Sequence, residues 1–251
     1  MPEGERFGVP EAANTAHITG RDVVAVEIES ARGSNVIEEQ KRLALKYMAQ
    51  GGNKFEMKNF CSSPLEAKKP WQVGTSIQYF DDWPRFKTLT DFVTRSCMSL
   101  RFGRHVADVC TFGNRWRWRG SWRTDTALVS LLSENGYLSD RFTNRALNNY
   151  AQVQDGFLVS GSGKYSVMIF DPGKAILLQW LKSVEKLIHE GLTVIAVSEP
   201  VEVLTYKDHE KQNEALRRLF AELFPTTVTN QAYSVGKGKT YRIEKEELPM
   251  L

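Results

Sequence analysis

The sequence predicts an α/β protein, in which a partial (β/α) barrel segment is followed by a doubly wound domain with a mostly parallel sheet. Three observations carry this prediction. An apolar strand near the N-terminus ends in two carboxylates, and strand and helix patterns alternate from about Arg104 onward. A content of 41% hydrophobic and 25% charged residues suits a globular chain that can bury a core.

The strand with two carboxylates lies in residues 22–30, which read D-V-V-A-V-E-I-E-S. Side chains alternate with a period of two along a strand, so Glu27 and Glu29 share one face with Val23 and Ala25. An apolar strand that is acidic at its carboxyl end is typical of the catalytic mouth of a (β/α) barrel. The alternative is a pair of solvated carboxylates in ordinary salt bridges at the rim.

Helical and strand periodicities predict five elements in the first part of the chain. They are a helix over 11–19, a strand over 23–28, a helix over 36–50, a strand over 54–60 and a helix over 86–104. We expect residues 1–85 to form the last strand–helix units of a (β/α) barrel.

The second part of the chain, residues 86–251, is predicted to be a flavodoxin-like or glutamine-amidotransferase-like α/β domain. Its expected helices cover 126–134, 143–151, 175–190 and 208–223, and its expected strands cover 105–112, 152–159, 164–170, 192–197 and 240–243. The segment V-G-K-G-K before the last strand lacks the spacing of a phosphate loop, which predicts a hairpin turn.

Charge and cysteine content exclude several classes of protein. A net charge of +3 over 251 residues gives no support for a nucleic-acid or membrane partner, and no stretch is apolar enough to span a membrane. Residues 115–123 interleave arginine with tryptophan, a pattern also used to bind single strands, but one such cluster does not change this expectation. The cysteines Cys61, Cys97 and Cys110 are too widely spaced for a zinc site and are expected to be buried thiols. The N-terminus shows no signal peptide, and the compartment stays open.

Five segments, taken together and in order, resemble the α-L-rhamnosidases of glycoside hydrolase family 106. They are E-A-A-N-T-A-H-I-T-G-R-D-V-V-A-V-E at 11–27, L-A-L-K-Y-M-A-Q-G-G-N-K-F at 43–55, Q-Y-F-D-D-W at 78–83, D-F-V-T-R-S-C-M-S-L-R-F-G-R-H-V-A-D-V at 91–109, and E-N-G-Y-L-S-D-R-F-T-N at 134–144. The resemblance implies a barrel followed by an α/β region. A complete barrel takes roughly 250 residues, so we expect this chain to be the C-terminal part of a longer enzyme.

The resemblance also implies the chemistry. Members hydrolyse terminal rhamnosyl bonds by inversion, which needs an acid and a base. Glu27 stands at the position of a functional glutamate and is expected to be the general base, with Glu29 as the second choice. The partner is then a rhamnose-containing glycan, and a calcium ion is the implied cofactor, although no oxygen-rich calcium loop occurs in this chain.

Further residues are expected to contact the sugar. His17 and Trp83 fit the family pattern, and Asn53 and Glu56 are the polar residues of the next strand. A packing role for His17, a turn role for Asn53 and a wedge between domains for Trp83 are the alternatives.

The chain departs from the family where histidines are expected, because Lys58 and Ser62 stand at those positions. This departure leaves rhamnose itself open as the sugar. We expect the chain alone to be inactive, and a non-catalytic carbohydrate-associated or structural module is the alternative function.

Overall fold

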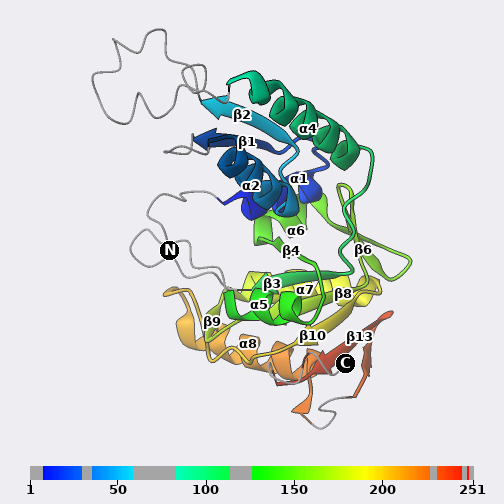
Figure 1. The fold of residues 1–251 in the computed structure, drawn as a ribbon. Helices are drawn as coiled ribbons and strands as arrows, with labels where there is room; N and C mark the ends of the chain where they lie inside the picture. Colours follow the sequence, from blue (N-terminus) through cyan, green and yellow to red (C-terminus); the bar gives the residue numbers. More distant parts are fainter. Residues whose placement is uncertain are drawn as a thin grey trace. The chain divides into compact units, whose positions relative to one another are not determined.

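The computed structural model describes residues 8–29, 36–58, 83–113, 126–226, 231–244 and 248. Within these ranges the chain has a mixed α/β architecture with several sheets, and none of the described strands closes into a barrel. Two compact units are present (Figure 1). One lies within residues 1–16 and 21–104, and the other within residues 17–20 and 105–251.

The first unit contains a two-stranded parallel sheet and the helices that cover it. Its elements are α1 (Val9–Thr19), β1 (Ala25–Glu29), α2 (Val36–Ala49), β2 (Lys54–Lys58) and α4 (Trp83–Arg101). Helix α1 belongs to this unit only as far as Ala16. Strands β1 and β2 run parallel, as Figure 1 shows beside α2 and α4.

One face of the β1–β2 pair packs against helices. Ile28 of β1 joins Ile37 and Ala44 of α2 and Leu89 of α4 in a buried apolar cluster. The opposite face of β1 is exposed, with Ala25 and Glu27 open to solvent. This alternation of buried and exposed side chains is what the period of a strand dictates.

The second unit holds the remaining elements. They are β3 (Val109–Gly113), α5 (Thr126–Glu134), β4 (Ser139–Phe142), α6 (Asn144–Tyr150), β5 (Gln152–Gln154), β6 (Phe157–Ser160), β7 (Gly163–Tyr165), β8 (Val167–Asp171), β9 (Ala175–Ile176), α7 (Leu178–Glu190), β10 (Thr193–Ala196), β11 (Glu202–Val203), α8 (His209–Leu223), β12 (Tyr233–Val235) and β13 (Gly238–Arg242). The last turn of α1, residues 17–19, also belongs to this unit.

A six-stranded sheet forms the centre of the second unit, in the order β12-β13-β10-β8-β3-β4. All neighbours are parallel except β12, which pairs antiparallel with β13. When the five parallel strands are numbered by their order along the chain, their order across the sheet from the β4 edge is second, first, third, fourth and fifth.

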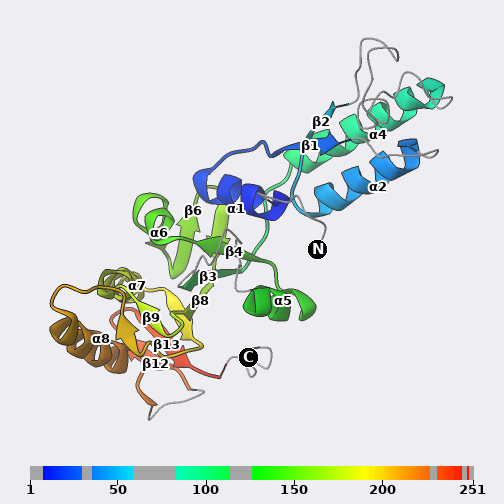
Figure 2. The ribbon, with the colours of Figure 1, turned by 90° about the vertical axis from the view of Figure 1, so that its left-hand side faces the viewer.

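Both faces of this sheet are covered. Helices α7 and α8 pack on one face, where Phe112, Met168 and Val194 point, while α5 packs on the other, where Ile169 and Ile195 point. Figure 2 shows α5 on the opposite side of the sheet from α7 and α8. Strands buried on both faces explain the near-continuous apolar runs of β8 and β10.

Two adjacent strands approach each other closely at the carboxyl edge of the sheet. Gly113, the last residue of β3, pairs with Asp171 at the end of β8. A Cβ atom placed on Gly113 would lie 1.9 Å from the carbonyl oxygen of Asp171. Only glycine fits at this position without displacing the backbone of β8.

Several predicted elements differ in detail. The single strand expected over 152–159 is a hairpin, because Asp155 and Gly156 both adopt positive φ, 51° and 81°, as a tight hairpin turn requires. The polar strand β4 is absent from the sequence prediction. The hairpin turn predicted at V-G-K-G-K is confirmed, with β12 and β13 on either side of it.

Candidate functional site

The exposed face of the β1–β2 pair, which we call the glutamate face, carries two glutamates side by side. Glu27 and Glu56 are in register on the parallel strands, and both are exposed. Side chains paired in register share a face, and neighbouring strands lie about 4.8 Å apart. The structure therefore brings Glu56 next to Glu27, two of the residues expected from the sequence to act on substrate.

A lysine lies on the same face. Lys54 pairs in register with Ala25, and its Nζ atom lies 3.2 Å from a carboxylate oxygen of Glu56. The side chains of Lys54 and Glu56 are 50% and 62% exposed, so this ion pair contributes little to stability. The exposed face thus carries two carboxylate side chains and one lysine ammonium group.

Asn53 is buried and holds the chain that leads into β1. Its Oδ1 accepts a hydrogen bond from the backbone N–H of Val24 at 2.8 Å, and its Nδ2 donates to the carbonyl of Asp22 at 2.7 Å. These contacts fix the start of β1 against β2. They tie Asn53 to the backbone beside the glutamate face.

Other expected residues lie partly or wholly outside the described ranges. Glu29 and Trp83 are the last residue of β1 and the first of α4, and the structure describes only their backbone. Lys58 ends β2 in the same way. Ser62, Cys61 and the arginine–tryptophan segment 115–123 lie outside the described residues.

A second group of polar side chains lies within the second unit. The buried carboxylate of Asp140 accepts a hydrogen bond from the hydroxyl of Tyr165 at 2.7 Å, and His17 Nδ1 lies 3.2 Å from its Oδ1. His105 Nε2 lies 3.1 Å from Oδ2. We call these four residues, His17, His105, Asp140 and Tyr165, the Asp140 cluster.

The two imidazoles of the Asp140 cluster are stacked. Their ring centroids are 3.6 Å apart, and the ring planes differ by 10°. His17 and His105 have side chains that are 17% and 23% exposed, while Asp140 is 5% exposed. The cluster is therefore largely buried, and part of each imidazole is accessible to solvent.

The carbonyl groups around His17 are held by the turn between β6 and β7. The N–H of Ser162 donates to the His17 carbonyl at 3.0 Å, and the hydroxyl of Ser160 donates to the Ile18 carbonyl at 2.9 Å. Gly161 lies between them, and a Cβ atom there would lie 2.2 Å from the His17 carbonyl oxygen. The glycine allows the close approach that places His17 beside Asp140.

Electrostatics favour an ionised Asp140. Burial alone would raise its pKa, but the contacts with His105, His17 and Tyr165 outweigh burial and lower the pKa to about 2. Burial, followed by the negative charge of Asp140, raises the pKa of Tyr165 and that of the neighbouring Cys110 thiol. Tyr165 and Cys110 are therefore protonated at neutral pH, and Asp140 is charged.

Sequence reasoning missed three members of the Asp140 cluster. Asp140 lies in the polar strand S-D-R-F, where only alternate residues are buried, and His105 lies in the link before β3. A signal was nevertheless present, because His17, His105 and Asp140 each belong to one of the segments that resemble the family. One histidine from each of two such segments contacts the carboxylate of Asp140, which lies in a third.

The ligand chemistry of the described residues does not fit calcium, the ion that the resemblance implies. Calcium takes six to eight oxygen ligands. Among residues with described side chains, the one metal-ligand group is His17, His105 and Asp140, which offers two nitrogens and one carboxylate. We assign no calcium ligand in the described part of this chain.

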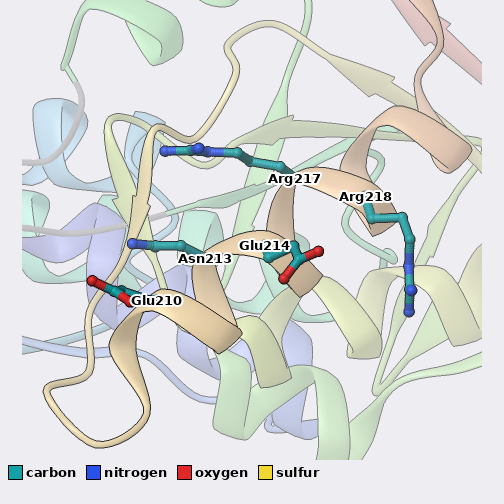
Figure 3. A pocket seen from close by; sticks show the side chains of 5 residues that line it. All are labelled: Glu210, Asn213, Glu214, Arg217 and Arg218. Carbon is teal, nitrogen blue, oxygen red and sulfur yellow. The ribbon is translucent and has the colours of Figure 1, made fainter.

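A depression of about 450 Å³ lies on the surface of α8. Its lining residues all come from that helix and are Glu210, Asn213, Glu214, Arg217 and Arg218. Figure 3 shows Arg217 and Arg218 extending in different directions. Asn213 already accepts a hydrogen bond from the N–H of Val203, and the mixed charges do not converge on one point. The depression does not qualify as a binding site.

A family model described as alpha-L-rhamnosidase, of glycoside hydrolase family 106, matches residues 4–247. The chain belongs to this family. This match confirms the resemblance over nearly the whole length of the chain.

Two further proteins are similar to this family member. A solved structure of a rhamnosidase from Novosphingobium sp. PP1Y superposes with a TM-score of 0.74 at 22% identity, over 96% of this chain and 24% of that one. A putative beta-glucuronidase from Formosa agariphila is 23% identical over 214 residues, which are 82% of this chain and 18% of that protein. The chain thus spans less than a quarter of the length of either relative.

Within the described residues, no helix has both the length and the apolar character needed to cross a membrane.

Proposed function

We propose that this chain supplies part of the active site of a glycoside hydrolase that releases terminal rhamnosyl groups by inversion, with Glu27 as general base. The observation that carries the proposal is the exposed position of Glu27 on β1, in a chain of the rhamnosidase family. Apolar packing of Ile28 against α2 and α4 holds the strand behind it. An exposed carboxylate on a strand is within reach of solvent, as a general base that activates water must be.

Inversion separates the acid and the base by roughly 6.5–9.5 Å, because a water molecule must fit between sugar and base. Glu56 lies on the adjacent strand, in register with Glu27, which is too close for that arrangement. We therefore assign Glu56 to contacts with sugar hydroxyls, together with Trp83. The general acid would come from a strand outside this chain.

His17 and Asn53 were also expected to contact sugar. Their side chains already bind Asp140 and the backbone at Asp22 and Val24. We assign them to positioning: Asn53 holds the start of β1, and His17 belongs to the Asp140 cluster. Glu29 follows Glu27 on the same face by strand alternation and remains the second choice for the base.

Glu27→Gln tests the assignment of the base. In the polypeptide that carries the complete barrel, we expect kcat on an aryl α-L-rhamnoside to fall by about 10²–10⁴, the usual contribution of a general base. Glu38→Gln, which alters an exposed glutamate paired with Arg85, is the matched control and should leave kcat unchanged. Full activity of Glu27→Gln would remove Glu27 from the mechanism.

A β-glucuronide is the second candidate substrate. The name of the Formosa agariphila relative suggests it, and Lys54 supplies a cation on the glutamate face that could pair with a uronic acid. The same assay with an aryl β-glucuronide separates the two sugars. Hydrolysis of the glucuronide alone would overturn the assignment to rhamnose.

We infer that catalysis needs barrel strands beyond this chain, and that the chain by itself is inactive. The small share of each relative that it covers supports this inference. The alternative is a non-catalytic carbohydrate-associated or structural module. The genomic sequence immediately upstream of Met1 distinguishes them, since continued coding for an acidic barrel strand favours the enzyme.

We also infer that the second unit is flavodoxin-like. The order of its parallel strands, second, first, third, fourth and fifth, supports that arrangement. Residues Gly113 and Asp171 then lie where the strand order reverses, between β3 and β8. This inference concerns the fold of the unit and assigns no ligand to it.

A further inference from the structure

The Asp140 cluster offers a ligand set that differs from the glutamate face and lies within one unit. His17, His105 and Asp140 each present one ligand atom, and these atoms lie within 4.8 Å of one another. Two imidazole nitrogens and one carboxylate oxygen are the donors that divalent transition metals prefer, zinc above all. This set leaves a fourth tetrahedral position for water.

The spacing of the donors suits a small ion. Around zinc with bonds of about 2.1 Å, neighbouring tetrahedral ligands are about 3.4 Å apart. His17 Nδ1 lies 3.2 Å from Oδ1 of Asp140 and His105 Nε2 lies 3.1 Å from Oδ2, so each nitrogen has its own carboxylate oxygen at about this spacing. The carboxylate is also held from behind by Tyr165, at 2.7 Å, as outer partners commonly orient the ligands of a metal.

An unsatisfied atom points to something further at this site. His105 Nε2 is buried and has no hydrogen-bond partner, although it lies 3.1 Å from Oδ2 of Asp140. Buried polar atoms almost always have a partner, and a bound ion is one of the explanations for an exception. This nitrogen lies beside a carboxylate oxygen, and a cation bound between the two would satisfy both atoms.

We propose that His17, His105 and Asp140 bind one divalent transition-metal ion of the zinc class, with Tyr165 as the outer hydrogen-bond donor. The proposal does not depend on the role of Glu27. It also differs from the calcium implied by the family, because nitrogen donors select against calcium.

Binding requires a change in the stacked rings. A nitrogen lone pair lies in the plane of its imidazole, and one ion cannot lie in both planes while the rings are parallel and 3.6 Å apart. His105 is the ring that turns, since it belongs to the link before β3 and is the more exposed of the two. His17 stays in place because the β6–β7 turn holds its carbonyl.

Calorimetric titration of the metal-stripped 251-residue chain with Zn²⁺, Co²⁺ and Ca²⁺ tests the proposal. We expect one Zn²⁺ per chain, binding of Co²⁺ with the visible absorption of nitrogen coordination, and no saturable binding of Ca²⁺. Absence of stoichiometric Zn²⁺ binding by the wild-type chain, whose fold is checked by circular dichroism, would overturn the proposal.

Variants locate the ion. His105→Asn should abolish the single site, and Tyr165→Phe should weaken Zn²⁺ by about 10–100-fold, the usual effect of an outer partner. His189→Asn removes an exposed histidine of α7 and serves as the matched control, with unchanged affinity expected. Equal Zn²⁺ affinity for wild type and His105→Asn would place the ion elsewhere and refute the assignment.

Discussion

At the scale of single residues, Asp140 is the one charged residue among the buried polar residues of the described part of the chain. It is 5% exposed, yet charged, because three neighbouring polar groups surround its two oxygens. A buried carboxylate without such partners would take up a proton. The arrangement therefore couples the charge of Asp140 to the fold of the unit.

Asp140→Asn should reduce stability in a way that depends on pH. The pKa of Asp140 is lowered from 3.8 to about 2, which corresponds to about 2 kcal/mol. This contribution is present above pH 3.8 and is lost as pH falls through about 2. Urea unfolding at pH 7 and near pH 2 measures it, and the variant should differ from wild type only at the higher pH.

Asp91→Asn is the control for this experiment. Asp91 pairs with Lys87 one helical turn away, and its side chain is 46% exposed. Such surface pairs contribute little, so we expect near wild-type stability at both values of pH. A loss at pH 7 that persists unchanged near pH 2 would show that Asp140 acts through shape and not through charge.

At the scale of elements, the sequence predicts strongly periodic segments best. Helices α5, α7 and α8 appear close to their expected residues, since apolar residues recur every three or four positions along each. Strand β4 was missed because it is short and polar, with only Asp140 and Phe142 buried. The β5–β6 hairpin differs from the single predicted strand, although D-G is a strong turn signal, because its strands are only three and four residues long and read as one run.

The close approach of β3 and β8 gives a prediction at this scale. Gly113→Ala should destabilise the second unit by about 1–3 kcal/mol, because the added methyl group would force the two strands apart. Gly103→Ala is the matched control, since a Cβ atom there meets nothing within 4 Å. Thermal unfolding distinguishes them, and equal melting temperatures for both variants would contradict the close approach.

At the scale of the whole molecule, local patterns identified Glu27 and Glu56 as separate candidates, but they indicated neither the pairing of these residues in register nor the Asp140 cluster. Glu27 can be identified as a candidate from the sequence because it lies at the acidic carboxyl end of an apolar strand. His17 and Asp140 are 123 positions apart, and their contact arises only when β4 and the β6–β7 turn have assembled. No periodicity within a single element contains that information.

The two units should differ in the protection of their backbone. In the described residues, β1 and β2 pair only with each other, and an isolated pair of strands is marginally stable. Strands β8 and β10 have a neighbour on each side. We expect hydrogen exchange to be faster in β1 and β2 than in β8 and β10, as measured by mass spectrometry. Equal protection would contradict this.

Among the described strands, β4 is one of the two edge strands of the six-stranded sheet, and its Asp140 is buried. An inward-pointing charge is one of the devices by which natural sheets prevent the edge of one molecule from adding to the edge of another. A second chain that tried to extend the sheet at β4 would need to keep this carboxylate ionised and correctly paired. We therefore expect the charge that contacts the two histidines also to disfavour edge-to-edge pairing of two molecules at β4.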